Sequence, residues 1–216
     1  MEQDANKLTK VPEFNAPPVK TVRKGFFSRD DLNAVVQRLP HYLRPVARFG
    51  YLTGWRKREI LTLTWAQVDR DAGMIRLEPG TTKNDEGREI PYRTLPELAA
   101  LIDERWERTR RVQRVMRAIV PTVFHRKGQP IKYIRTAWDS ACLKAGLPGS
   151  WFHDLRRSAV RNMERAGVSR SVAMKITGHK TESIYKRYAI ADVASIEEGM
   201  AKLASLDSGR LAAENE

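Results

Sequence analysis

Cysteine is nearly absent from this chain of 216 residues, because Cys142 is the only one. A single cysteine excludes an internal disulfide and a zinc site built from thiolates, and it fits a reducing compartment. The four histidines, His41, His125, His153 and His179, lack the spacing typical of metal ligands. We therefore expect neither a bound metal nor a cofactor.

Long apolar runs are missing as well. No stretch of eighteen apolar residues occurs, so no segment is expected to span a membrane. The first ten residues, MEQDANKLTK, contain no apolar core of the kind that a secretion signal needs. Hydrophobic residues still make up 41% of the chain, which is enough for a folded core and excludes wholesale disorder. The length favours one domain.

Acidic residues are in short supply. The chain has 26 Asp and Glu against 39 Lys and Arg, a formal net charge of +13. A membrane-binding protein would concentrate its bases on one amphipathic helix or tail, but here they are spread along the chain, which ends in LAAENE. This distribution favours a nucleic acid as the partner, although a merely solvated basic surface would have the same charge.

The hydrophobic pattern predicts a mainly α-helical (α+β) fold with one small antiparallel β-hairpin. Alternating residues at 74–78 and 88–92 flank the turn sequence NDEG and predict the hairpin. Val123 and Phe124 are expected to form a short strand. Helices are expected from Ser28 to Pro40, at 43–53, from 55 onward, and at 95–117, 132–145, 154–166, 169–177, 181–188 and 193–206.

His153 and Arg156 form the first candidate site. They are three residues apart at the start of a predicted helix, so their side chains point the same way. An imidazole can move a proton near neutral pH, and a guanidinium presents a fork of donors that matches phosphate oxygens. The pair suits phosphoryl chemistry, although such a pair by itself is more often a surface feature.

Further segments surround this pair in a fixed order. Arg56 begins a helix in TGWRKRE, where free backbone amides favour anions, and Lys83 lies beside the hairpin turn in TTKNDEGREIPY. His179, in ITGHKTES, follows HDLRRSAVRNMERAGVS, and Tyr188, in IYKRY, comes nine residues after His179. Together these segments resemble the tyrosine recombinase, or phage integrase, family. The resemblance covers roughly residues 25–195, the catalytic domain of that family.

The resemblance implies a site-specific DNA recombinase that cleaves and rejoins strands through a covalent 3′-phosphotyrosyl intermediate, for integration or excision of a mobile element. In this reading Tyr188 is the nucleophile, and Arg56 and Arg156 bind the non-bridging phosphate oxygens. His153 exchanges a proton with the tyrosine, and His179 donates a hydrogen bond to a phosphate oxygen.

Two supporting roles also follow from the resemblance. Lys83 would protonate the departing 5′-oxygen, and Glu59 would orient the site by pairing with basic neighbours. Each has a plainer alternative: a solvated hairpin lysine, and an i,i+3 partner of Arg56. Tyr185 lies on the same predicted helix as Tyr188 and competes for the nucleophile's role, but the step of nine residues from His179 favours Tyr188.

Other residues are expected to have structural or surface roles. Arg157 points about 100° away from Arg156 around the helix, so a phosphate or surface contact is expected. His41 and His125 are expected to face solvent. The five tryptophans are expected in the core, with Trp65 and Trp138 on apolar helical faces.

We divide the chain into an extended arm at 1–25, a catalytic domain at 26–192, and a C-terminal helix and tail at 193–216. The family normally carries an N-terminal core-binding domain, so this chain resembles the catalytic domain alone. The implied partners are double-stranded DNA and further copies of the chain assembled on it, the free form being monomeric, in a bacterial or phage-encoded protein of the cytoplasm. The C-terminal helix would dock on a neighbouring protomer or pack in cis. A non-catalytic DNA-binding module and a type IB topoisomerase are the alternatives.

Overall fold

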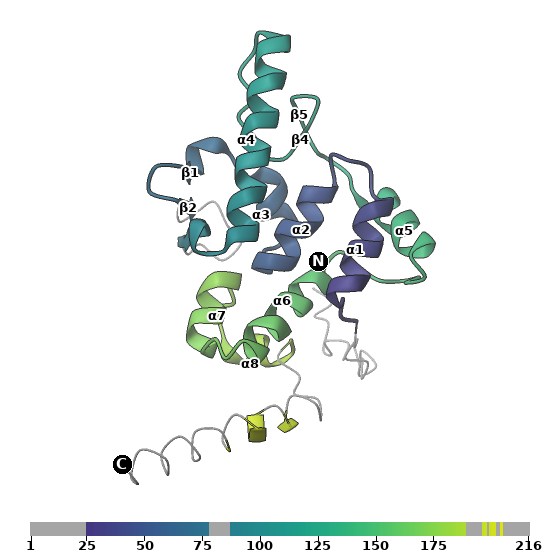
Figure 1. The fold of residues 1–216 in the computed structure, drawn as a ribbon, viewed down its shortest axis with the longest axis vertical. Helices are drawn as coiled ribbons and strands as arrows, with labels where there is room; N and C mark the ends of the chain where they lie inside the picture. The colour runs from purple at the N-terminus through teal and green to yellow at the C-terminus, as the bar shows by residue number, and fades with distance from the viewer. Residues whose placement is uncertain (1–24, 78–86, 189–195, 198, 202–203, 205–216) are drawn as a thin grey trace, which may run out of the picture.

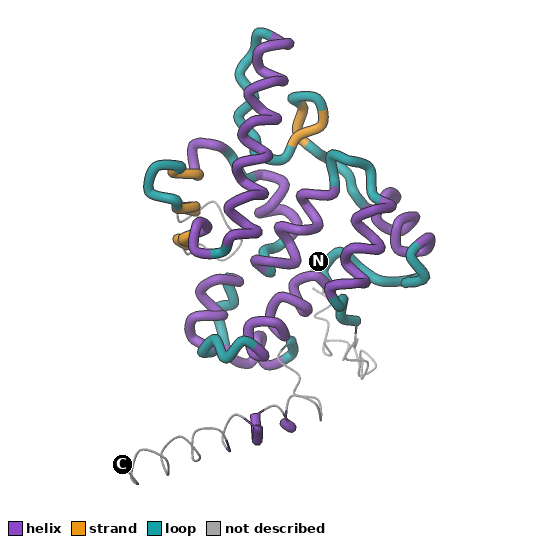
Figure 2. The backbone as a smooth tube through the Cα atoms, in the orientation of Figure 1, coloured by secondary structure: helices purple, strands orange, loops and turns teal. Residues whose placement is uncertain are grey.

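The computed structural model describes residues 25–77, 87–188, 196–197, 199–201 and 204. Helices dominate this part of the chain, and the strands form a small antiparallel sheet and a second short pair (Figure 2). The fold is therefore the mainly helical α+β class that the sequence predicts. The helices are α1 (Arg29–Arg38), α2 (Arg44–Thr53), α3 (Lys57–Thr62), α4 (Pro96–Met116), α5 (Arg135–Lys144), α6 (Asp154–Arg165), α7 (Arg170–Thr177) and α8 (Glu182–Lys186).

Local signals set the helix ends as expected. The Ser28 hydroxyl accepts a hydrogen bond from the Asp31 amide at 3.0 Å, and the Asp31 carboxylate accepts one from the Ser28 amide at 2.9 Å. This reciprocal capping starts α1. Helix α2 ends at Gly54, which adopts the left-handed conformation with φ of 67°. The chain therefore turns sharply between α2 and α3, and Arg56 lies in that turn.

The predicted hairpin is confirmed. Strands β2 (Met74–Leu77) and β3 (Arg88–Pro91) pair antiparallel, with Ile75 opposite Ile90 and Leu77 opposite Arg88. A third strand, β1 (Val68–Asp69), pairs with β2; it was missed because two residues are too few to show alternation. The turn at 78–86, which contains Lys83, lies outside the described residues.

The prediction of a strand at Val123 and Phe124 was wrong. Both residues are buried in an irregular segment, and the strand β4 (His125–Arg126) begins one residue later and pairs with β5 (Gln129–Pro130). His125 is buried, not solvent-facing: Nε2 lies 3.0 Å from the Thr109 hydroxyl and Nδ1 accepts from the Gly128 amide. Burial lowers the pKa of His125 to about 4, so the imidazole is neutral.

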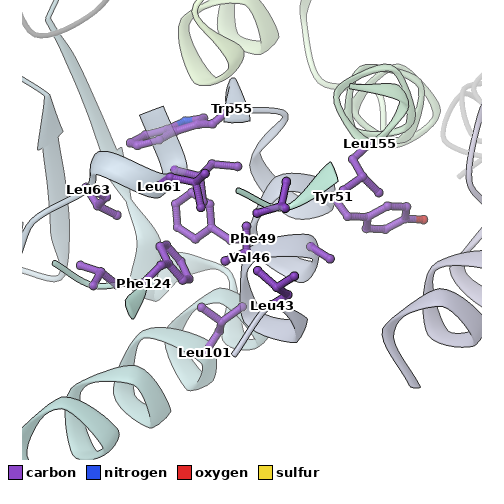
Figure 3. Close-up of a cluster of buried hydrophobic side chains, with 14 of the residues drawn as sticks. Leu43, Val46, Phe49, Tyr51, Trp55, Leu61, Leu63, Leu101, Phe124 and Leu155 are labelled. Atoms are coloured by element: carbon purple, nitrogen blue, oxygen red, sulfur yellow. The ribbon is translucent and has the colours of Figure 1, made fainter. Parts of the chain in front are cut away.

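Helix α2 lies at the centre of the core (Figures 1 and 3). Phe49 packs edge-on against Trp55 and Phe124, with ring centroids 5.4 Å apart in each pair. Leu155, from α6, belongs to the same buried cluster, and α2 and α6 pack closely. Because α3 follows α2 directly, this packing fixes the start of α3 relative to α6.

The tryptophans are not all in the core. Trp55 and Trp138 are buried, and Trp65 and Trp106 are half-buried and stack edge-on with centroids 4.9 Å apart. Trp151 is 61% exposed, so the expectation for this residue was wrong. It precedes α6 in an irregular segment, where no helical periodicity reports burial.

The predicted arm at 1–25 falls almost entirely outside the described residues. So does much of the predicted helix at 193–206, although residues 196–197, 199–201 and 204 are helical. Helices α6, α7 and α8 gather at one end of the described domain, away from the far end of α4 (Figure 1). Across the described part of the chain, no helix is long and apolar enough to cross a membrane.

Candidate active site

Arg156 is at the centre of the site and is almost fully buried, with 2% of its surface exposed. It lies in the first turn of α6, and its Nη1 donates to the Gly54 carbonyl at 2.6 Å and also to the Thr177 carbonyl. Its Nε donates to Nε2 of His179 at 3.2 Å. Burial and the charge of Arg56 lower the pKa of Arg156 to about 10, so it remains a cation at neutral pH.

The hydrogen bonds of His179 fix its tautomer. Because Nε2 accepts from Arg156, the ring proton lies on Nδ1, which donates to the Thr177 hydroxyl at 2.7 Å. That hydroxyl donates in turn to the Ala173 carbonyl at 2.7 Å. Burial and the nearby arginines lower the pKa of His179 to about 3. His179 is therefore neutral, and it orients Arg156 in this structure. A hydrogen bond from Nε2 to a phosphate oxygen would require both the loss of the Arg156 contact and a proton on Nε2.

Tyr188 lies two residues beyond the end of α8 and is half-buried. Its hydroxyl is 3.0 Å from Nε2 of His153, the residue that precedes α6. Its ring centroid is 4.9 Å from that of His179. The guanidinium carbon of Arg157 lies 5.6 Å from the centre of the Tyr188 ring. The Tyr188 phenol thus contacts the imidazole of His153 and lies beside the imidazole of His179. The guanidinium of Arg157 lies over its ring.

The protonation state of His153 allows it to accept a proton. Partial desolvation and the Arg156 guanidinium lower the pKa of His153 below its usual value. The ring is therefore neutral at neutral pH, and in the tautomer with its proton on Nδ1 it accepts a hydrogen bond from Tyr188. A neutral imidazole at this distance is the arrangement that general-base chemistry requires.

Arg56 and Glu59 form the other wall of the site. Arg56 Nη1 lies 2.9 Å from Glu59 Oε1, and Arg56 Nη2 donates to the Gly178 carbonyl at 3.3 Å. Arg88, from β3, places its Nη2 2.7 Å from Glu59 Oε2. Burial alone would raise the pKa of Glu59, but Arg88 and Arg56 hold it below its usual value. Glu59 is therefore an ionised carboxylate between two guanidiniums.

Tyr185 has a different environment from Tyr188. It is fully buried, and its hydroxyl donates to Glu164 at 2.9 Å. Burial and Glu164 raise the pKa of Tyr185 well above its usual value, which disfavours its phenolate form. The two tyrosines do not share a helical face, because α8 ends at Lys186.

The structure brings together six of the residues singled out in the sequence: Arg56, Glu59, His153, Arg156, His179 and Tyr188. Lys83 lies outside the described residues. Sequence reasoning missed Arg88, whose signal was its alternation with Ile90 on the buried face of β3. A phosphate or surface contact was expected for Arg157, and its position over the Tyr188 ring could not be derived from helical angles, because Tyr188 lies beyond the end of α8.

No metal centre accompanies this site in the described part of the chain. There, no group of three or more His, Cys, Asp or Glu side chains could hold a metal ion. The ionisable groups around Tyr188 are instead arginines and imidazoles. This donor set suits the binding of an anion and the transfer of a proton.

Comparisons with known proteins show what the chain as a whole is similar to. The integrase of Salmonella phage P22 is 23% identical over 192 residues, which cover 87% of this chain and 49% of that protein. The crystal structure of XerA recombinase matches with a TM-score of 0.63 and 16% identity, over 82% of this chain and 64% of the other. A lambda integrase tetramer bound to a Holliday junction matches with a TM-score of 0.57 and 18% identity, over 77% of this chain and 48% of the other.

The chain thus spans about half the length of the phage P22 integrase. Its fold is that of tyrosine recombinase catalytic domains. The sequence pattern of the phage integrase family matches residues 27–194, which include every described residue of the site. The chain belongs to the phage integrase family.

Proposed function

We propose that this chain cleaves and rejoins DNA strands at a specific site, with Tyr188 as the nucleophile, in the integration or excision of a mobile element. The observation that carries the proposal is the contact of 3.0 Å between Tyr188 Oη and His153 Nε2, beside the buried Arg156. A phenol next to a neutral imidazole and a guanidinium can attack a phosphodiester.

The first step forms one bond and breaks another. The Tyr188 oxygen attacks phosphorus, and its proton moves to Nε2 of His153 as the new P–O bond forms. The P–O5′ bond breaks, which leaves a 3′-phosphotyrosyl ester and a free 5′-hydroxyl. Lys83 supplies the proton of that hydroxyl in this proposal.

Two arginines match the charge that develops at phosphorus. A phosphodiester carries one negative charge, and its five-coordinate state carries about two. Arg56 and Arg156 supply two positive charges next to that position, and both are held by backbone carbonyls and by Glu59 or His179. Donors fixed before reaction need no reorganisation as the charge forms.

The second step reverses the first on another strand. A 5′-hydroxyl attacks the phosphotyrosyl ester and gives its proton to Lys83. The bond between phosphorus and the Tyr188 oxygen breaks, and His153 returns its proton to Tyr188. One phosphodiester replaces another of similar energy, so the exchange consumes no nucleotide. Double-stranded DNA is the substrate, and copies of this chain assemble on it in this proposal. The net charge of +13 supports binding to a polyanion.

A suicide substrate tests the proposal. A duplex nicked beside the cleavage site loses the short 5′-hydroxyl strand after cleavage and traps the covalent protein–DNA adduct. We expect an adduct with the wild type and none with Tyr188→Phe. Tyr185→Phe is the matched control, because Tyr185 is buried against Glu164 and should still form the adduct.

Three results discriminate between functions. DNA binding without adduct in the wild type would replace the proposal with a non-catalytic DNA-binding module. Relaxation of supercoiled plasmid without recombination would favour a type IB topoisomerase. Equal adduct formation by the wild type and Tyr188→Phe would refute Tyr188 as the nucleophile.

A further inference from the structure

Arg88 is buried, and it takes no part in the two reaction steps proposed above. It is the first residue of β3, at the base of the hairpin, and its side chain is 7% exposed. Its Nη2 lies 2.7 Å from Glu59, and its guanidinium carbon lies 4.8 Å from the centre of the Trp55 ring. Both terminal nitrogens are shielded from solvent, so Arg88 acts through protein neighbours.

Arg88 shares one carboxylate with Arg56. Glu59 Oε1 pairs with the Arg56 side chain, while Oε2 pairs with Arg88 and accepts from the Arg56 amide at 3.0 Å. With Arg56 alone, the Glu59 carboxylate would form a neutral pair and compete with a phosphate for that guanidinium. With Arg88 present, the three groups carry a net positive charge, and Arg156 raises the total to two.

Arg88 also packs against the turn that precedes His179. Gly178 ends α7 with φ of 71°, and a Cβ atom there would lie 2.2 Å from Arg88 Nη1. The Arg88 guanidinium therefore lies directly on the Gly178 backbone, whose carbonyl accepts from Arg56. Arg88 thus connects the base of the hairpin, the start of α3 and the turn at His179.

We propose that Arg88 is a positioning residue for strand cleavage: it holds Glu59 and the Gly178 turn in place so that Arg56 stays free to bind phosphate. This proposal rests on the proposed function. It predicts that losing Arg88 slows the reaction more than it weakens DNA binding, because Arg88 shapes the site without reaching the DNA.

The test measures three quantities: single-turnover adduct formation on the suicide substrate, the Kd for the same duplex, and stability by urea unfolding. Arg88→Met should slow adduct formation about 10- to 100-fold, the scale of a lost charge-assisted hydrogen bond, and leave the Kd nearly unchanged. Arg88→Lys keeps the charge and should restore part of the rate. Arg76→Met is the matched control, because Arg76 pairs with Asp69 and Glu89 on the exposed side of the neighbouring strand.

Coupling with Glu59 separates positioning from a general structural role. In a Glu59→Gln background the carboxylate that Arg88 holds is absent, so adding Arg88→Met should slow adduct formation far less than it does alone. Full additivity of the two effects on the rate would overturn the proposal. If Arg88→Met does not fold, Arg88→Gln carries the test, because it removes the charge and keeps a polar side chain, and a rate equal to wild type would overturn the proposal.

The two proposals fail in different ways. If the wild type forms no adduct, both fall together. If the wild type and folded Arg88→Met form adducts at equal rates, only the role of Arg88 is refuted. A loss of rate that matches the loss of Kd in Arg88→Met would also overturn it, because it would assign Arg88 to DNA binding.

Discussion

Replacing His153 with alanine should slow strand cleavage by a factor that depends on pH. The structure places His153 Nε2 3.0 Å from the Tyr188 hydroxyl, and the variant removes that acceptor. Loss of a positioned general base typically slows a reaction by about 10²- to 10⁴-fold, and we expect the cleavage rate of His153→Ala at pH 7 to fall within that range.

The pH profile gives the sharper result. The defect of His153→Ala should shrink as the pH rises, because hydroxide in solution increasingly removes the proton that the imidazole accepts in the wild type. In the wild type, desolvation and Arg156 lower the pKa of His153, and the ring must be neutral to accept the proton. The wild-type rate should therefore fall as the pH drops through the lowered pKa of His153, and His153→Ala should lack that fall.

Single-turnover adduct formation on the suicide substrate, followed on denaturing gels from pH 5 to 9, measures both effects. His41→Ala is the control, because His41 is exposed and the structure places it outside the site. The reasoning fails if His153→Ala loses less than about tenfold at pH 7, below the usual contribution of a general base. It also fails if the wild type and His153→Ala lose rate in the same way at acidic pH, because the imidazole would then not be the group that titrates.

Further predictions concern stability, reactivity and binding. Gly178→Ala should destabilise the fold more than Gly146→Ala in urea unfolding, because both have positive φ but only the Gly178 Cβ would displace Arg88; equal losses would contradict this. Phe49→Ala should lower the free energy of unfolding by about 3–5 kcal/mol, and a loss under 1 kcal/mol would refute its central place in the core. Cys142 is buried and its pKa is raised to about 12 by burial, so a thiol reagent should label it only after unfolding, and fast labelling of the native protein would contradict its burial. The log of DNA affinity should fall against the log of salt concentration with a slope of about −0.9 per phosphate contacted; a slope near zero would argue against DNA as the partner.

Much of the fold follows from local signals in the sequence. The Ser28 cap, Gly54 and the alternation of 74–78 with 88–92 each depend on a few neighbouring residues, so their structural meaning does not require the rest of the chain. Val123 and Phe124 were misplaced because a short apolar run has the same appearance in a buried loop and in a strand.

Less of the site than of the fold could be predicted from the sequence alone. Spacing pointed to Tyr188, but only the structure shows that Tyr185 is buried against Glu164. His125 looked like a surface residue because its partner Thr109 lies sixteen residues away on α4. Arg88 was missed for the same reason, since its contact with Glu59 joins two segments that no local pattern relates.

The most direct test of the central claim is to map the covalent adduct. Trypsin cleaves after Lys186 and Arg187, which places Tyr185 and Tyr188 on different peptides. Mass spectrometry of the trapped and digested complex should find the nucleotide remnant on the peptide that begins with Tyr188. A remnant on the peptide that contains Tyr185, or on any other residue, would contradict the account.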